Sequence, residues 1–197
     1  MKRTSDDLFL DSLDLATSAT VRRALDAIDA SNMNDAKTLL SSLSDKHTAV
    51  ALYYLATLSD ANEDSVGFAN RHLQQLETAA RLAYAPALHK LAIYYDSGDL
   101  VKRDVVKAAT LFKAAADMGH PHAQWIHGMD LLYGRSGIQQ NEKLGISYIQ
   151  QAVSAKFEGA LITLAEFYEN GSNNFPKNCS EASNLRLLAE SSTSLGF

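Results

Sequence analysis

A spacing of 36 to 37 residues runs through most of this 197-residue sequence. In the stretch APALHKLAIYYDSG, small and apolar residues stand at positions 87, 91, 92, 95 and 98, and similar residues recur one period earlier and later. A second set recurs in the same register, at Ala36, His72, Ala108, Gly145 and Ala182. Because periods of this length are typical of stacked repeat units, we expect the chain to fold as a repeat array.

Each period is predicted to form two antiparallel helices joined by a short loop. Apolar residues spaced three and four apart in both halves match the 3.6-residue period of a helix. A glycine suited to a left-handed helix end follows the first helix, and an Asp or Asn suited to capping precedes the second. These residues are Gly98, Gly134 and Gly171, and Asp104, Asn141 and Asn178. Only three prolines and ten glycines occur, which also favours helix, so we expect an all-α fold, a right-handed α/α solenoid of four to five hairpins.

The register predicts one solenoid over residues 17–197. It divides into a degenerate repeat over 17–50 and further repeats over 51–86, 87–122, 123–159 and 160–197. Residues 1–16 are expected to form a capping helix or a frayed tail. Two repeats depart from the pattern, because Asn62 replaces the loop glycine, and His127 and Gly145 stand where larger residues or Ala are usual. We expect looser hairpins at both places.

The order of these residues resembles the Sel-one-like repeat (SLR) family, whose α/α hairpins are related to tetratricopeptide repeats. The resemblance covers 51–197 and, more weakly, 17–50. The best match lies in 87–122, at Ala87, Leu91, Ala92, Tyr95, Gly98, Asp104, Lys107, Ala108, Ala115, Ala116 and Gly119. The resemblance implies a protein–protein interaction scaffold rather than a catalyst. Bacterial members of the family include signalling adaptors, host-interaction factors and immunity proteins that neutralise toxins.

The first helix of each repeat offers a candidate surface for a partner. Positions 89, 93 and 96 lie opposite the recurring residues, and the related tetratricopeptide scaffold implies that such a stripe lines the concave surface. Along the repeats the stripe comprises Tyr53, Thr57, Asp60, His89, Ile93, Asp96, Trp125, Met129, Tyr133, Ile162, Glu166 and Glu169. Aromatic residues and Met are typical of binding hot spots. The alternative is that Trp125, Met129 and Ile93 pack against the adjacent repeat.

Charge narrows the class of partner. The formal net charge is −5, and the longest basic run is Lys102-Arg103, which argues against a nucleic-acid partner. Acids at 60, 96, 166 and 169 would favour a partner with a basic surface, unless they are simply solvated helix ends. No apolar run approaches the length of a membrane span. Aspartates interrupt any apolar export segment near the N-terminus, and Cys179 is the only cysteine, so we expect a cytoplasmic protein.

The stretch GHPHAQWIHG at 119–128 resembles a metal site but fits a joint between repeats better. His122 and His127 are five residues apart, which separates them by about 140° around a helix, so they do not converge on one ion. His127 stands at a Leu position and is expected to be buried with one hydrogen-bond partner, while His120 is expected to pack as a flat ring. Pro121 suits the first turn of the next helix. We therefore predict no metal and no cofactor.

The sequence contains no recognisable catalytic motif, so we predict no catalytic residue. DSGDLVKRD at 96–104 lacks the ligand spacing of a calcium loop, and YGRSG at 133–137 lacks the Lys of a phosphate loop. The leading hypothesis is a non-catalytic scaffold, in its most specific form an immunity protein that neutralises a cognate toxin. The alternatives are a signalling adaptor or assembly factor, and a hydrolase with Cys179 as its nucleophile.

Overall fold

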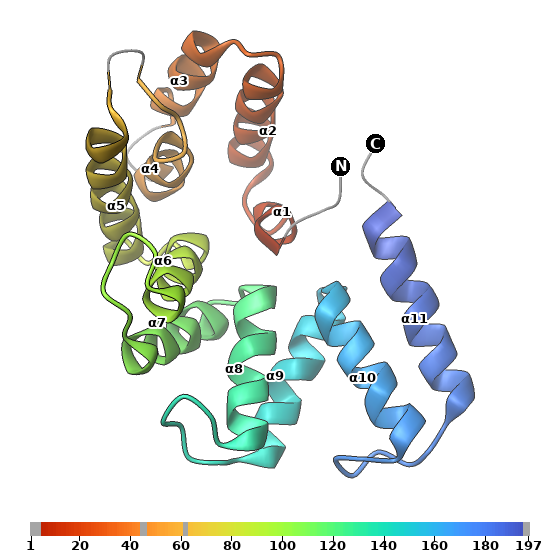
Figure 1. Ribbon diagram of the computed structural model, residues 1–197. Helices are drawn as coiled ribbons and strands as arrows, with labels where there is room; N and C mark the ends of the chain where they lie inside the picture. Colours follow the sequence, from red (N-terminus) through yellow and green to blue (C-terminus); the bar gives the residue numbers. More distant parts are fainter. Residues whose placement is uncertain (1–4, 44–46, 61–62, 195–197) are drawn as a thin grey trace. The chain divides into compact units, whose positions relative to one another are not determined.

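The computed structural model describes residues 5–43, 47–60 and 63–194, and this part of the chain holds eleven helices and no strand (Figure 1). The expected all-α architecture of paired helices is confirmed. The helices are α1 (Ser5–Leu10), α2 (Leu15–Asp29), α3 (Met33–Ser41), α4 (Thr48–Leu55), α5 (Ser65–Arg81), α6 (Ala85–Ser97), α7 (Val105–Asp117), α8 (Pro121–Tyr133), α9 (Glu142–Ser154), α10 (Glu158–Asn170) and α11 (Cys179–Ser194).

The helices fall into two compact units. The first unit comprises Leu10–Asp104, and the second comprises Val105–Phe197 together with Met1–Phe9. In the first unit α2 packs against α3, and α5 packs against both α4 and α6. In the second unit α8 packs against α7 and α9, and α10 packs against α9 and α11. We call α4, α6, α8 and α10 the A helices, and α5, α7, α9 and α11 the B helices.

The glycines expected to end the A helices lie directly after them, and the Asp and Asn residues expected to cap the B helices lie directly before them. Gly98, Gly134 and Gly171 directly follow α6, α8 and α10, and their positive φ angles of 86°, 64° and 65° lie in the left-handed region. A side chain in this region is strained, which explains the glycines. At the start of α9, the side-chain oxygen of Asn141 accepts a hydrogen bond from the Leu144 N–H at 3.1 Å. Each loop therefore fixes where one helix ends and the next begins.

The expectation of a loose hairpin over 123–159 is wrong, because α8 and α9 make a very close crossing. A Cβ atom on Gly128 would lie 2.8 Å from the carbonyl oxygen of Gly145, and a Cβ on Gly145 would lie 2.6 Å from that of Gly128. The last hairpin has Ala165 and Ala182 at the same register positions. Because Gly128 and Gly145 replace these two alanines, the backbones of α8 and α9 can approach each other closely. The glycines that were expected to loosen this hairpin therefore tighten it.

In the repeat over 51–86, side chains take the place of the missing glycine cap. Helix α4 stops at Leu55, and the Arg71 guanidinium of α5 donates to the carbonyl oxygens of Leu58 at 2.6 Å and Leu55 at 3.4 Å. The same guanidinium binds both carboxylate oxygens of Glu63, at 2.7 and 2.9 Å. Asn62 itself lies outside the described residues. These bonds join the end of α4 to α5 across a loop that glycine does not terminate.

His72 adds a second polar link at the position that holds Ala in other repeats. Its Nδ1–H donates to the carbonyl oxygen of Ala56, and its Nε2 accepts from the Tyr94 hydroxyl, both at 2.7 Å. A carbonyl oxygen can only accept, which assigns the proton of the neutral ring to Nδ1. His72 is buried, and it connects α5 with the end of α4 and with α6. The imidazole thus joins two consecutive A helices of the first unit.

We predict that Gly145→Ala lowers the free energy of unfolding by about 1–3 kcal/mol, because the added methyl group has no room at the crossing. This loss exceeds the gain of up to about 1 kcal/mol in helix propensity. Ser147→Ala is the matched control, since Ser147 is exposed on the same helix, and it should change stability by less than about 0.5 kcal/mol. Urea denaturation followed by circular dichroism measures both. Equal stability of Gly145→Ala and wild type would contradict the close crossing.

Candidate partner-binding surface

The second unit carries six candidate residues on two neighbouring helices. We call these six residues the A face: Trp125, Met129 and Tyr133 on α8, and Ile162, Glu166 and Glu169 on α10. Tyr133 and Glu166 are exposed, and the other four are half-buried. Helices α8 and α10 are in contact, so the two sets of side chains belong to one surface.

Trp125 lies where these two helices meet. Its Nε1–H donates to the Thr163 hydroxyl on α10 at 2.9 Å, and this hydroxyl donates to the carbonyl oxygen of Gly159 at 2.8 Å. The rings of His122 and Phe157 lie 5.7 and 5.9 Å from the indole, centroid to centroid. Trp125 therefore packs against the adjacent repeat, as one of the two alternatives expected, and it stays half-buried, so its role in binding a partner remains a prediction.

Two members of this aromatic cluster were not among the residues predicted from the sequence. His122 stacks on Phe157 with ring centroids 5.0 Å apart, and both rings flank Trp125. A signal for His122 was available, because a residue three positions before Trp125 on a helix lies on the same face. Phe157 precedes α10 in the chain, and only the packing of consecutive repeats places it beside α8. The cluster is thus built by the junction between repeats.

The rest of the A face combines apolar side chains with one ion-paired acid, Glu169, and one exposed acid, Glu166, whose charge also acts on Arg186. Met129 and Ile162 pack against the hydrophobic core of the second unit. The Arg186 guanidinium of α11 binds both carboxylate oxygens of Glu169, at 2.8 and 2.9 Å, and these hydrogen bonds hold the pKa of Glu169 below its ordinary value. Glu166 takes part in no ion pair among the described residues. The negative charge available to a partner is therefore smaller than the sequence suggested.

In the first unit the structure turns two candidate residues inward. Tyr53 is only 6% exposed and packs edge-to-face against Tyr54 and Tyr84, with ring centroids 5.1 and 5.3 Å away. His89 is also buried. Both side chains belong to the interior of the fold, so neither is available to a partner. On α6, Ile93 is half-buried and Asp96 is exposed.

Thr57 and Asp60 do not lie on helix A, although the register places them there. Helix α4 ends at Leu55, and both residues follow it in the loop. Asp60 pairs with Lys37, and the hydrogen bond from this lysine lowers the pKa of the Asp60 carboxyl. The register assumed a helix of full length, and the short α4 breaks the predicted stripe in the first unit.

The histidines of 119–128 take up structural positions. His120 is fully buried, and its Nδ1 accepts a hydrogen bond from the Ala123 N–H at 3.3 Å, which caps the start of α8 at Pro121. His127 is buried as expected, but its Nδ1 has no hydrogen-bond partner among the described residues. Its ring instead meets that of Tyr148 edge-to-face at 4.9 Å. This stretch is a joint between α7 and α8, as its register indicates.

Burial gives two of these histidines low pKa values. It lowers the pKa of His122 to about 4, an effect that nearby His120 reinforces and Asp6 opposes. It also lowers the pKa of His127, with a further contribution from the charge of Lys113. Both imidazoles are therefore neutral at pH 7, and the cluster around Trp125 is uncharged.

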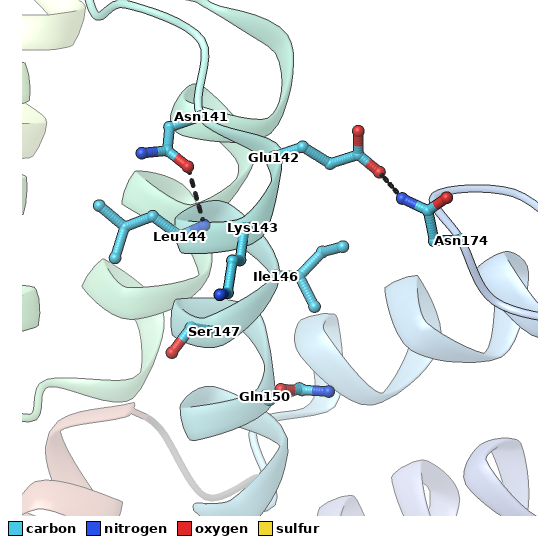
Figure 2. A pocket seen from close by; sticks show the side chains of 8 residues that line it. All are labelled: Asn141, Glu142, Lys143, Leu144, Ile146, Ser147, Gln150 and Asn174. Atoms are coloured by element: carbon cyan, nitrogen blue, oxygen red, sulfur yellow. Dashed lines mark hydrogen bonds between the residues drawn. The ribbon is translucent and has the colours of Figure 1, made fainter.

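A hollow of about 830 Å³ lies on the second unit over a B helix rather than an A helix (Figure 2). It is lined by Asn141, Glu142, Lys143, Leu144, Ile146, Ser147 and Gln150 of the α9 region, and by Asn174. Asn174 donates to the Glu142 carboxylate at 2.5 Å and thereby links the α10–α11 loop to α9. None of the candidate residues lines it. Its lining holds neither His nor Cys.

Cys179 is exposed at the first position of α11. It makes no hydrogen bond with a histidine in the described ranges, so the arrangement of a cysteine nucleophile and its base is not formed there. Among the helices that the structure describes, none is long and apolar enough to span a bilayer.

Helix hairpins of constant register, closed by glycine and stacked through small residues, define an α/α repeat protein. A family model for the Sel1 repeat matches residues 85–120, 121–157 and 160–182. Over these residues the chain is therefore built of Sel1 repeats, as its sequence pattern indicated.

Solved structures agree with this fold. A Sel1 repeat protein from Oxalobacter formigenes is similar with a TM-score of 0.66 and 20% identity, over 87% of this chain and 68% of that chain. A protective antigen of uropathogenic Escherichia coli with an SLR fold is similar with a TM-score of 0.61 and 17% identity. The match covers 88% of this chain and 38% of that longer chain. An immunity protein from Pseudomonas aeruginosa gives a TM-score of 0.41, which is too low to show a shared fold, and 20% identity, over 76% of this chain and 67% of that chain. The first two similarities support a shared fold, but sequence identities this low do not show a shared function.

We predict that stability falls as the pH drops from 7.5 to 5, because the unfolded chain protonates His122 and His127 near pH 6.5, whereas the folded chain protonates them only at lower pH. The folded pKa values are lowered, so the unfolded state binds more protons below pH 6.5. The stability contributed by the neutral rings is fully present above pH 6.5 and is lost as the pH falls. For His122 the loss continues toward pH 4 and amounts to at most about 2 kcal/mol at pH 5. For His127 the loss has the same direction.

His127→Leu tests this prediction, since Leu55, Leu91 and Leu164 occupy the same register position. Urea denaturation of both proteins at pH 7.5 and pH 5 should show a smaller loss of stability for the variant. Comparing the two pH values cancels any change in packing that the leucine introduces. Identical losses in variant and wild type would mean that His127 is not a neutral, buried imidazole.

Proposed function

We propose that this protein is a non-catalytic scaffold that binds a protein partner through the A face of its second unit. The observation that carries the proposal is Trp125, which is half-buried against His122 and Phe157 and has its only side-chain hydrogen-bond donor satisfied by Thr163. A partner can cover the exposed part of this ring without leaving the indole N–H unpaired. Aromatic rings held rigidly in this way are typical hot spots of protein interfaces.

The first unit contributes less to the proposed surface. Tyr53 and His89, the two aromatic candidates of the first unit, are buried. Ile93 and Asp96 on α6, and Thr57 and Asp60 in the loop after α4, remain candidates for additional contacts. We therefore expect the A-face residues of α8 and α10 to contribute most of the binding energy.

An immunity protein that neutralises a toxin is the most specific form of this proposal, and a signalling adaptor or assembly factor is the alternative. The two differ in what binding does to the partner. An immunity protein abolishes the activity of an enzymatic partner in a stoichiometric complex, whereas an adaptor leaves it intact. Assaying the captured partner with and without this protein separates the two roles.

We predict that Trp125→Ala and Tyr133→Ala each reduce partner capture by tenfold or more, about 1.4 kcal/mol or above. Capture uses the tagged full-length protein and a lysate of the source cells, with quantification by mass spectrometry. Tyr133 is 50% exposed, so its removal leaves the core intact. Leu187→Ala on α11 is the matched control, because Leu187 is 63% exposed and lies outside the A face.

Two results would contradict the proposal. Unchanged capture by Trp125→Ala and Tyr133→Ala would exclude the A face as the binding surface. A turnover of any substrate that disappears in Cys179→Ala would show that the protein is an enzyme and not a scaffold.

A further inference from the structure

Positive charge is absent from the two A helices of the second unit. Helices α8 and α10 together hold four acidic residues and no Lys or Arg. The rest of residues 105–197 holds seven Lys and Arg against four acids, all on B helices and loops. In the first unit, by contrast, α4 carries no charged residue, and α6 carries both Lys90 and Asp96.

The four acids differ in how far they are neutralised. Asp130 is buried with its carboxylate 3.5 Å from the Arg135 guanidinium, and Glu169 is bound by Arg186. Glu158 and Glu166 take part in no ion pair or side-chain hydrogen bond among the described residues. They lie eight residues apart on α10, with Ile162 midway between them. Since residues four apart share a helix face, these three side chains form an acidic strip with an apolar centre.

An apolar strip runs beside it on α8. His122, Trp125, Met129 and Tyr133 follow one another at intervals of three and four residues, so they also share one face of a helix. The imidazole of His122 is neutral at pH 7 and adds no charge. The hydrogen bond from Trp125 to Thr163 holds the two strips next to each other. The surface thus offers apolar contacts along one helix and negative charge along the next.

From this arrangement we propose that the occupant of the A face is a basic, amphipathic helix of the partner protein. The apolar side of such a helix covers the α8 strip, and its Lys or Arg side chains face Glu158 and Glu166 on α10. Both strips repeat at helical spacing, which a partner helix matches with residues three and four apart. Helices α8 and α10 carry no cation of their own that would repel the basic side chains. Two guanidinium groups contact this surface from outside these helices: Arg135 lies over the Tyr133 ring, and Arg186 pairs with Glu169. This inference rests on the proposed function, because it specifies what the A face binds.

Trp125 is the only tryptophan of the chain, so its fluorescence reports directly on the occupancy of the A face. The full-length protein is titrated with three tryptophan-free synthetic peptides, each about 15 residues long so that a helix of several turns can form. The first has Leu at helical spacing and Lys elsewhere. The second has Glu in place of every Lys. The third contains the residues of the first in an order that forms no apolar face.

The Lys peptide should bind and change the Trp125 emission, more weakly as salt is added, while the other two bind at least tenfold more weakly. Glu166→Lys should weaken binding of the Lys peptide by about tenfold, and Glu166→Gln by less. Glu166 is exposed, so neither change disturbs the core, which circular dichroism confirms. The matched control is Glu77→Lys on α5, an exposed glutamate of a B helix in the first unit, which should leave binding unchanged.

Each contrary outcome overturns a stated part of the inference. No binding of the Lys peptide, or equal binding of the Glu peptide, would exclude a basic occupant. Equal binding of the rearranged peptide would exclude a helical one. If Trp125→Ala abolishes partner capture while Glu166→Lys leaves the Lys peptide unaffected, the proposed function stands and this inference fails. If Trp125→Ala leaves capture unchanged, the proposed function itself fails.

Discussion

The close crossing of an A helix over its B helix is the contact on which the rest of the structure depends. At Gly128 and Gly145 the approach is limited by the backbone itself, since even a methyl group on either glycine would meet a carbonyl oxygen. Short distances of this kind keep α8 and α9 together as one hairpin. That hairpin in turn places α8 against α10, where Trp125 reaches Thr163. The candidate surface is therefore a consequence of small residues that lie away from it.

Much of this fold could be predicted from the sequence, because its repeat signals are local. Glycine after helix A and Asn before helix B each act within a few residues, so the bounds of α8, α9 and α10 follow from the register. The end of α4 could not be predicted in this way. It depends on Arg71 and His72, which reach back from α5 to carbonyl groups 13 to 16 residues earlier in the chain. A glycine signal was absent, and nothing in the spacing indicated that side chains would replace it.

The candidate surface was predictable only in part, since the same register position has different environments in the two units. Trp125 lies at a junction with Phe157 and stays half-buried, whereas Tyr53 meets Tyr54 and Tyr84 and is enclosed. Register assigns a side of the helix, but the size of the neighbouring side chains decides how much of a residue stays exposed. Two acids of α10 also differ in their surroundings. Glu169 and Glu166 have the same charge and helix face, but Arg186 forms its ion pair with Glu169.

The segregation of charge in the second unit also affects how molecules approach it. Four formal negative charges lie on α8 and α10, and the remainder of 105–197 carries three more positive than negative residues. Separated charges of opposite sign form an electric dipole, and a dipole exerts a torque on a charged molecule before any contact is made. Within the screening distance of about 8 Å at physiological ionic strength, cationic and anionic molecules are thus turned toward different sides of this unit. Orientation is selected during the encounter, which is a kinetic property that the affinity of the final complex does not reveal.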